Sequence, residues 1–253
     1  MEYPRNAKDP DPTAWSRIPD PAHAAIFLDF DGTLTEIVAR PEDVAWTDQH
    51  TNALNKVVDA TGGATAVVSG RRLNDLERLL DGFQGTLCGG HGAEMQGDPA
   101  PHPPRGILEM TQAITSEVDA SDGVWVEAKP GGFTVHYRAA PAFGASVKHS
   151  IQKLIAGRDD LHLFPAKMAW EVRPAEHSKG GAIERLMRTE PFLGRCPVFA
   201  GDDTTDFDAF ATVAALGGIT VAVGNRDVTA DVYMTDPSEV RLWLFGKDGP
   251  WDA

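Results

Sequence analysis

Three apolar runs of the sequence each end in side chains suited to phosphate chemistry. Asp29 and Asp31 follow the run AAIFL, Ser69 follows TAVV, and Asp202 and Asp203 follow CPVFAG. In an open parallel sheet, ligands bind beyond the carboxyl ends of the strands, so neighbouring runs would bring these groups to one edge. The spacing therefore predicts a single site that gathers a hydroxyl and several carboxylates.

Carboxylates crowded at one edge repel one another unless a cation lies between them. Oxygen ligands of this kind suit Mg²⁺, which takes one or two carboxylates and completes its coordination with water and a substrate phosphate. Taken alone, Asp31–Gly32 is also typical of a turn, and Asp202–Asp203 of a helix N-terminus. Their joint occurrence with Ser69 and a lysine at a predicted helix start favours a magnesium site.

The aspartate pair predicts a covalent mechanism of phosphoryl transfer. Asp29, the last residue before the turn, is placed to attack phosphorus and form an aspartyl-phosphate. Asp31 can protonate the leaving alkoxide and later deprotonate the attacking water. The Ser69 hydroxyl and the Lys179 ammonium, in the first turn of a predicted helix over 177–188, would hold the phosphoryl oxygens. Judged alone, Lys179 is typical of a solvated surface lysine, and only its place before the third run favours a role at the site.

The elements that must position these groups alternate between apolar runs and amphipathic stretches, as in a parallel α/β sheet with crossover helices. The apolar runs cover 24–30, 65–70, 196–203 and 219–224, and helices are predicted over 47–63 and 73–82. Thr47 is a suitable N-cap for the first helix, and Gly62–Gly63 a suitable end.

The middle of the chain follows another pattern, because its predicted strands alternate between apolar and polar residues. The strands 124–129 and 133–138 are joined by PGG and predict an antiparallel hairpin, a third strand covers 167–173, and two amphipathic helices cover 107–118 and 143–157. We therefore predict an N-terminal tail at 1–22, a parallel α/β core formed by 23–96 and 174–253, and an α+β module at 97–173 inserted into that core.

The composition excludes other classes of protein. The chain has 253 residues, of which 23 are basic and 37 acidic, and its formal net charge of −14 argues against a nonspecific nucleic-acid binder. It contains no run of about 18 apolar residues and no apolar segment typical of a signal peptide. Its two distant cysteines predict buried free thiols in a reducing compartment. We expect a cytoplasmic protein that binds neither nucleic acid nor membrane and acts as a monomer.

Four ordered segments resemble the motifs of haloacid-dehalogenase (HAD) superfamily phosphatases. They are DFDGTL at 29–34, SGR at 69–71, SKGGA at 178–182 and GDDTTD at 201–206. More closely, the sequence resembles the trehalose-6-phosphate phosphatase family, which has segments similar to HGAE (91–94), AKPGGFTVHYR (128–138) and KMAWEVRP (167–174). The resemblance spans about residues 24–245. It implies a Rossmann-like HAD core with a parallel sheet, an inserted α/β cap with an antiparallel sheet, Mg²⁺ dependence, and hydrolysis of trehalose 6-phosphate as the last step of trehalose biosynthesis.

The resemblance also implies a role for each acidic residue. Asp29 would be the nucleophile and a metal ligand, and Asp31 the acid/base and a ligand through its backbone carbonyl. Asp202 would bind the metal directly. Asp203 would act through water or in the surroundings of the metal, and Asp206 would brace the loop.

The sugar is expected to bind polar side chains of the inserted module, because the core residues handle only the phosphate. On the resemblance, the sugar-binding residues are Lys129, Arg138, Lys167 and Glu171, together with Arg71 and His91 from the core. His136 shares the polar face of its strand with Arg138. Trp125 and Trp170 could stack on a sugar, but packing within the module is the preferred interpretation.

The sequence departs from the family pattern at Gly90, Ala128 and Phe207, all near the expected sugar site. A phosphatase for another sugar phosphate, such as sucrose 6-phosphate or a glycosylated phosphoglycerate, is therefore the alternative enzyme. A catalytically silent sugar-phosphate sensor is an alternative of another class. The intact pair of Asp29 and Asp31 argues against the sensor, because a sensor needs neither a nucleophile nor an acid.

Overall fold

The computed structural model of the chain describes residues 17–38, 40–99, 102–118, 123–129, 131–166, 168–174, 177–224, 228–246 and 251. The chain divides into two compact units. One unit, here called the core unit, comprises Met1–Gly97 and Lys179–Ala253, and the other, the inserted unit, comprises Asp98–Ser178.

The core unit is built on a seven-stranded sheet with the strand order β11-β10-β9-β1-β2-β3-β4. Its strands are β1 (Ala24–Leu28), β2 (Thr65–Val68), β3 (Thr86–Gly89), β4 (Glu94–Met95), β9 (Cys196–Gly201), β10 (Ile219–Val223) and β11 (Val232–Met234). The pairs are parallel except for β3 with β4, which is antiparallel. This topology confirms the predicted Rossmann-like core, to which β3, β4 and β11 add strands that the sequence patterns did not indicate.

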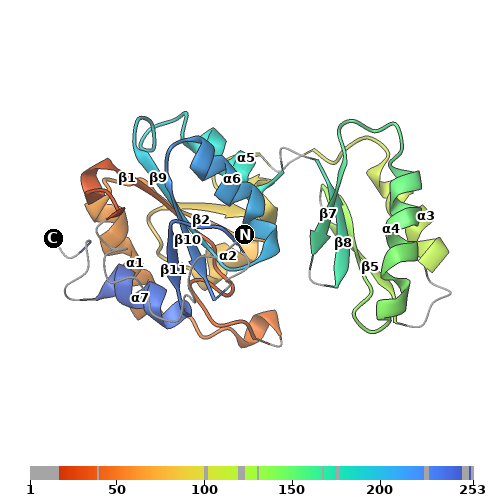
Figure 1. Cartoon of the computed structure of the whole chain (residues 1–253), viewed down its shortest axis with the longest axis horizontal. Helices are drawn as coiled ribbons and strands as arrows, with labels where there is room; N and C mark the ends of the chain where they lie inside the picture. Colours follow the sequence, from red (N-terminus) through yellow and green to blue (C-terminus); the bar gives the residue numbers. More distant parts are fainter. Residues whose placement is uncertain are drawn as a thin grey trace, which may run out of the picture. The chain divides into compact units, whose positions relative to one another are not determined.

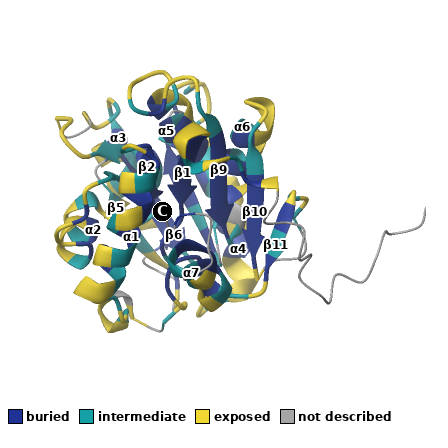
Figure 2. Ribbon diagram, turned by 90° about the vertical axis from the view of Figure 1, so that its left-hand side faces the viewer, coloured by how far each residue is buried: buried dark blue, intermediate teal, exposed yellow. Residues whose placement is uncertain are grey.

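Helices cover both faces of this sheet (Figure 1). On one face lie α1 (Asp48–Ala60), α2 (Leu73–Leu79) and α7 (Pro237–Phe245), and on the other α5 (Lys179–Leu186) and α6 (Phe207–Ala215). Along β1, Ile26 and Leu28 pack toward the first group of helices, whereas Ala25 and Phe27 pack toward the second. All four residues are fully buried, as Figure 2 shows for the central strands, because a parallel sheet has no solvated face. Short 3₁₀ helices occupy Pro21–His23, Pro41–Asp43, Gly90–Gly92, Pro141–Phe143 and Thr204–Asp206.

The ends of α1 follow the predicted capping chemistry. Thr47 and His50 form a capping box, in which each side chain pairs with the other residue's backbone N–H. Gly62 and Gly63 follow the helix with φ values of 56° and 94°, a left-handed conformation that favours glycine.

Two expectations for buried and exposed residues need correction. Ile18 falls within the predicted tail, yet only 9% of it is exposed, and it packs into the core cluster of the α1 face. An isolated apolar residue can therefore anchor a segment whose overall composition is polar. Residues 1–16 lie outside the described residues. Cys88 is a buried free thiol, as predicted, but Cys196 is only partly buried because it opens β9 at the edge of the core.

The inserted unit is a four-stranded antiparallel sheet with the order β5-β6-β8-β7, which confirms the predicted antiparallel module. Its strands are β5 (Trp125–Lys129), β6 (Gly132–His136), β7 (His162–Ala166) and β8 (Ala169–Arg173). Helices α3 (Ile107–Val118) and α4 (Gly144–Leu154) pack on one face of the sheet through Ile114, Ile151 and their neighbours (Figure 1). Among the described helices of the whole chain, none has the length and apolar character needed to cross a membrane.

Three details of the predicted strands are wrong. The strand predicted at 167–173 begins at Ala169, because Met168 takes a φ of 57° in the tight turn between β7 and β8. Strand β7 was not predicted, because HLFPA contains a proline and lacks a clear alternation. Strand β6 ends at His136, so Arg138 lies in the following turn rather than on the strand.

Candidate active site

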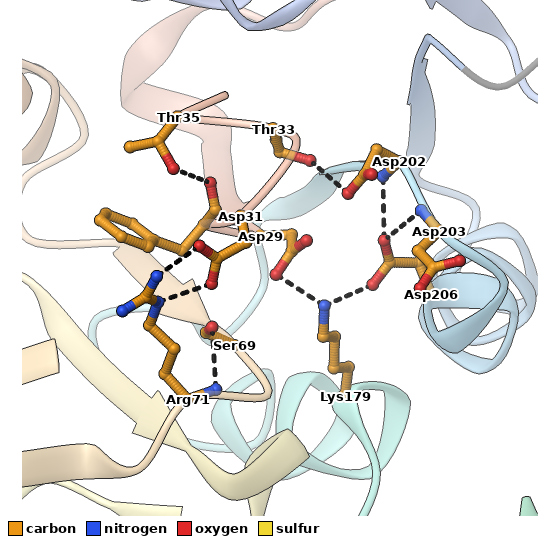
Figure 3. Close-up of polar contacts among 11 residues, drawn as sticks. Asp29, Asp31, Thr33, Thr35, Ser69, Arg71, Lys179, Asp202, Asp203 and Asp206 are labelled. Atoms are coloured by element: carbon orange, nitrogen blue, oxygen red, sulfur yellow. Dashed lines mark hydrogen bonds and ion pairs between the residues drawn. The ribbon is translucent and has the colours of Figure 1, made fainter. Parts of the chain in front are cut away.

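The carboxyl ends of three adjacent strands bring the predicted catalytic groups together. Strand β1 lies between β2 and β9, with Leu28 aligned to Val67 on one side and Ala200 on the other. Asp29, Ser69 and Asp202 therefore follow at the same edge, and the Asp29 N–H donates to the carbonyl of Ala200 at 2.9 Å. Figure 3 shows their side chains facing one another.

The turn after β1 needs glycine at position 32. Gly32 has a φ of 87°, and a Cβ atom on it would lie 2.2 Å from Oδ2 of Asp202. The Gly32 N–H donates to the carbonyl of Thr35 at 2.7 Å, and the Leu34 N–H donates to that of Phe30 at 2.9 Å. This close turn places the first and fourth motifs in contact.

Lys179 is the buried cation of the site. Its Nζ lies 2.6 Å from Oδ1 of Asp29 and 2.5 Å from Oδ1 of Asp206 (Figure 3), and its side chain is 2% exposed. Burial alone would lower the pKa of the ammonium, but the two carboxylates outweigh this effect and raise it. The structure therefore places at the centre of the site a lysine that sequence alone could not distinguish from a surface residue.

Asp206 pairs with Lys179 and also fixes the loop that follows β9. Its buried Oδ2 accepts hydrogen bonds from the N–H groups of Asp202 and Asp203, at 2.9 and 3.1 Å. The neighbouring Asp208 accepts from the Gly180 N–H at 2.9 Å and so ties α6 to the start of α5. These contacts fit the bracing role expected for Asp206 and extend it to Lys179.

Three carboxylates are close enough to share a metal ion. Oxygen atoms of Asp29, Asp202 and Asp206 lie within 4.8 Å of one another. Burial, with the neighbouring carboxylates, raises the pKa of Asp29 above its ordinary value and that of Asp202 to about 7. An oxygen-only set whose negative charges disfavour one another suits a hard divalent cation, so these residues fit such an ion. Because two amides and Lys179 already engage Asp206, Asp29 and Asp202 are the freer carboxylates.

Asp31 turns its carboxylate away from this cluster and toward Arg71. The guanidinium donates from Nε to Oδ2 at 2.6 Å and from Nη2 to Oδ1 at 2.7 Å. It also lies over the ring of Phe30, with Cζ 5.6 Å from the ring centroid, and the Arg71 N–H donates to Oγ of Ser69 at 3.2 Å. Arg71, which was expected to bind the sugar, holds both oxygens of the expected acid/base in this structure (Figure 3).

His91 lies beside the Ser69–Arg71 loop in a left-handed conformation with a φ of 56°. Its N–H donates to the carbonyl of Ser69 at 2.9 Å. A Cβ on Gly70 would lie 2.6 Å from Cε1 of the imidazole, so the ring packs directly on this glycine. The structure thus brings His91 to the catalytic edge of the core unit.

The sugar-binding residues expected in the inserted unit are partly brought together. Nζ of Lys129 lies 3.2 Å from Oε1 of the buried Glu171, and Nε of Arg173 lies 3.8 Å from its Oε2. Lys167 lies outside the described residues. Arg138 occupies the turn after β6.

The two tryptophans of the inserted unit differ. The Trp170 Nε1 donates to the carbonyl of Gly144 at 2.9 Å, and Lys148 lies over its ring, so Trp170 packs against α4 as expected. Trp125 is 55% exposed and does not pack in that way.

Sequence reasoning missed three residues that shape the site. Thr33 donates to Asp202 at 3.5 Å, and the Glu94 carboxylate accepts from the Leu73 N–H at 2.6 Å, at the start of α2. The third is Asp208. Thr33 and Glu94 lie inside the motifs DFDGTL and HGAE, so the sequence offered a signal for these two residues. No motif pointed to Asp208.

Of the three departures from the family pattern, Gly90 and Phe207 lie next in sequence to residues of the catalytic edge, and the Gly90 N–H donates to the carbonyl of Arg71 at 2.7 Å. Gly90 has a φ of 55°, which favours glycine, and Ala128 is exposed on β5. Phe207 opens α6 and is 44% exposed.

Comparisons with known proteins agree with this arrangement. A family model described as trehalose-phosphatase matches residues 27–238. The trehalose-6-phosphate phosphatase of Escherichia coli K12 is 34% identical over 232 residues, covering 88% of this chain and 86% of that protein. A probable trehalose-phosphate phosphatase of Sinorhizobium fredii is 32% identical, covering 86% and 84%.

Solved structures share the fold. The C-terminal domain of Candida albicans trehalose-6-phosphate phosphatase has a TM-score of 0.73 at 23% identity, covering 92% of this chain and 93% of that one. The C-terminal domain of the C. albicans trehalose synthase regulatory protein has a TM-score of 0.68 at 13% identity, covering 92% and 95%.

Proposed function

Because the chain belongs to the trehalose-phosphatase family, we propose that it hydrolyses trehalose 6-phosphate to trehalose and phosphate through an aspartyl-phosphate on Asp29. The observation that carries the proposal is the placement of Asp29. Its carboxylate lies at the end of β1 against Lys179, with Asp202 beside it and Asp31 two residues on. A nucleophile, a fixed cation and a second carboxyl group thus occur together.

In the first step, the Asp29 carboxylate attacks phosphorus and the bond to O6 of the sugar breaks. Asp31 donates a proton to the leaving alkoxide, so that neutral trehalose departs. In the second step, Asp31 takes a proton from water, the water oxygen attacks phosphorus, and the bond to Asp29 breaks. Phosphate leaves, and both carboxyl groups return to their starting forms.

The surrounding residues orient these groups. Lys179 fixes one oxygen of Asp29 and supplies positive charge next to the developing phosphorane. Arg71 donates to both oxygens of Asp31 and so fixes the plane of that carboxyl group. The Ser69 hydroxyl, at the end of β2, is placed to donate to a phosphoryl oxygen.

Asp29, Asp202 and the backbone carbonyl of Asp31 would hold a Mg²⁺ ion, with Asp203 in its surroundings and Asp206 bracing the loop. When bound, the ion would offset the repulsion between the anionic nucleophile and the anionic phosphate. The raised pKa values of Asp29 and Asp202, caused first by burial and then by the neighbouring carboxylates, support this assignment, because a bound cation would offset both effects.

Lys129, Arg138, Lys167 and Glu171 would recognise the sugar, with Arg71 and His91 contributed by the core unit. The enzyme would act in the cytoplasm as a monomer, in the last step of trehalose biosynthesis. The sensor alternative deserves a test because a regulatory protein shares the fold. The complete set of Asp29, Asp31 and Lys179 favours the enzyme.

The test is phosphate release in the presence of Mg²⁺ from trehalose 6-phosphate, sucrose 6-phosphate, glucose 6-phosphate and a glycosylated phosphoglycerate, with Asp29→Asn as the control. The proposal expects a strong preference for trehalose 6-phosphate, loss of activity with EDTA, and loss in the variant. A preference for another member would overturn the substrate, and binding without release from any member would favour the sensor.

A further inference from the structure

Trp125 presents a flat aromatic surface on the inserted unit. It opens the edge strand β5, directly opposite His136 on β6. The indole stacks on the imidazole with ring centroids 3.9 Å apart and an interplanar angle of 12°. Despite this contact, 55% of the residue is exposed. One face of the indole is therefore supported by a second ring while much of the side chain meets solvent.

The supporting imidazole is itself held in place. Nε2 of His136 lies 3.0 Å from Oε2 of Glu127. This hydrogen bond is the main reason that the pKa of Glu127 lies below its ordinary value. Because an ionised carboxylate only accepts hydrogen bonds, Nε2 of His136 carries the proton of this pair. The two rings form a stack whose exposed member is the tryptophan, and Glu127 holds the imidazole through its Nε2 atom.

The stack lies on the sheet face opposite α3 and α4. Side chains alternate along a strand, so Trp125 shares a face with Glu127 and Lys129, at a spacing of about 7 Å between alternate residues. Val126 points to the other face and packs with the helices. Glu127 and Glu171 lie on either side of Thr134 in the register, which places Glu171 on the same face as the tryptophan.

An aromatic plane bordered by carboxylates and an ammonium suits one kind of ligand. A pyranose ring presents C–H groups on its faces and hydroxyl groups around its edge. The C–H groups can lie on an indole, while the hydroxyls pair with charged acceptors and donors beside it. A peptide or lipid partner would be expected to need a broader apolar patch than a single ring.

We propose that the exposed face of the Trp125 indole binds a hexose ring of the substrate, so that Trp125 contributes to the choice of sugar phosphate. The proposal rests on the proposed function, since it assumes a sugar phosphate as substrate. Trp125 is then a substrate-binding residue, and His136 and Glu127 are positioning residues that fix the plane of the indole.

The test compares two substrates on the full chain and on three variants. Trehalose 6-phosphate carries hexose rings, whereas acetyl phosphate carries no ring and reports the catalytic site alone. The variants are Trp125→Ala, Trp125→Phe, which keeps a flat ring, and Leu108→Ala. Leu108 is the matched control, because it is also apolar and 64% exposed but belongs to α3.

We expect the ratio of kcat/KM for trehalose 6-phosphate to kcat/KM for acetyl phosphate to fall about tenfold in Trp125→Ala, mainly through KM, which corresponds to ~1.4 kcal/mol. Trp125→Phe should recover part of the ratio, and Leu108→Ala should leave it at the wild-type value. Trehalose, which lacks the phosphate, should inhibit acetyl phosphate hydrolysis by the wild type. The same inhibition of Trp125→Ala should require a trehalose concentration about tenfold higher.

A ratio in Trp125→Ala within twofold of the wild type would overturn the proposal, as would an equal fall in Leu108→Ala. An unchanged ratio together with a change in molecular mass on gel filtration would identify Trp125 as a contact between copies of the chain. If the wild type hydrolyses acetyl phosphate but not trehalose 6-phosphate, the proposed function fails, and this proposal fails with it. That outcome differs from hydrolysis of trehalose 6-phosphate with an unchanged ratio in Trp125→Ala, which would overturn this proposal alone.

Discussion

The catalytic edge of the core unit and the open sheet face of the inserted unit are built in opposite ways. At the catalytic edge, Asp29, Lys179 and Asp206 are nearly inaccessible, and ion pairs of 2.5 and 2.6 Å join them. On the open face, Trp125 and Glu127 are about half exposed. A buried charge that loses its partner is costly, whereas an exposed side chain can change at little cost in stability. On the proposed roles, the comparison assigns the reaction to buried, ion-paired side chains and part of the choice of substrate to exposed side chains that can change at little cost in stability.

The largest expected effect is at the nucleophile. Asp29→Asn should lower kcat at least about 10⁴-fold on every phosphate ester, because an amide cannot form the aspartyl-phosphate. Phosphate release with trehalose 6-phosphate and acetyl phosphate measures this loss, and circular dichroism checks the fold. A variant that loses activity on only one of the two substrates would break the comparison, since Asp29 would then act in specificity.

The second effect is on the buried lysine. Lys179→Met should lower the free energy of unfolding by about 3 kcal/mol, because it leaves Asp29 and Asp206 buried without their cation. It should also reduce kcat on both substrates. Urea unfolding measures the change in the free energy of unfolding. The control is Arg188→Met, which removes one partner of an exposed ion pair and should cost less than about 1 kcal/mol. Equal costs for the two variants would contradict the view that buried charges define the catalytic edge.

The third effect separates stability from activity. The pKa of Asp202 is raised to about 7, so the folded state binds more protons than the unfolded state between about pH 4 and 7. The stability of the metal-free protein should therefore fall as the pH rises through this range. Asp202→Asn removes the charge, and in EDTA it should melt about 4 °C higher than the wild type at pH 8, with a smaller difference near pH 5.

The same variant should lose most of its activity with Mg²⁺, because it lacks a metal ligand. Calorimetry at the two pH values and phosphate release provide the measurements. A variant less stable than the wild type at pH 8 would show that Asp202 is not under repulsion in the folded protein.

The smallest effect is expected on the open face of the inserted unit. Glu171→Gln should lower kcat/KM for trehalose 6-phosphate about tenfold or more and leave acetyl phosphate hydrolysis much less affected, because a neutral amide is a weaker acceptor for sugar hydroxyls. Glu117→Gln, on the exposed side of α3, controls for the loss of one acidic charge, and urea unfolding measures the separate cost of breaking the ion pairs of the buried Glu171. Equal losses on both substrates would place Glu171 in the catalytic machinery and weaken the contrast between the two regions.

The sequence allowed the fold and the placement of Asp29 and Asp202 at neighbouring strand ends to be predicted, because both depend on local patterns. Asp29 and Asp202 directly follow apolar runs, in the segments DFDGT and GDDTTD. They are therefore expected at strand ends, whatever the tertiary arrangement of the rest of the chain. Strand β7 was missed because it contains a proline and lacks a clear alternation, and Met168 because a turn conformation leaves no periodic signal.

The remaining contacts depend on tertiary structure. Arg71 and Asp31 are 40 residues apart, and no local pattern pairs them. Lys179 stands in the first turn of a helix, a place typical of a solvated lysine, and only the packing of α5 against the strand ends buries it. The exposed position of Trp125 likewise follows from the register of β5 with β6, since both faces of a strand offer a plausible place for tryptophan.

The most direct test of the central claim is to locate the covalent intermediate. The variant Asp31→Asn, mixed with p-nitrophenyl phosphate and Mg²⁺, should still be phosphorylated, because this leaving group needs no proton, but it should hydrolyse slowly. We predict a burst of nitrophenolate of about one per enzyme molecule. After acid quench and borohydride reduction, peptide mass spectrometry should find homoserine in place of Asp29. A burst with the modification at another residue, or turnover by the wild type with neither a burst nor a modified Asp29 in this variant, would contradict the claim.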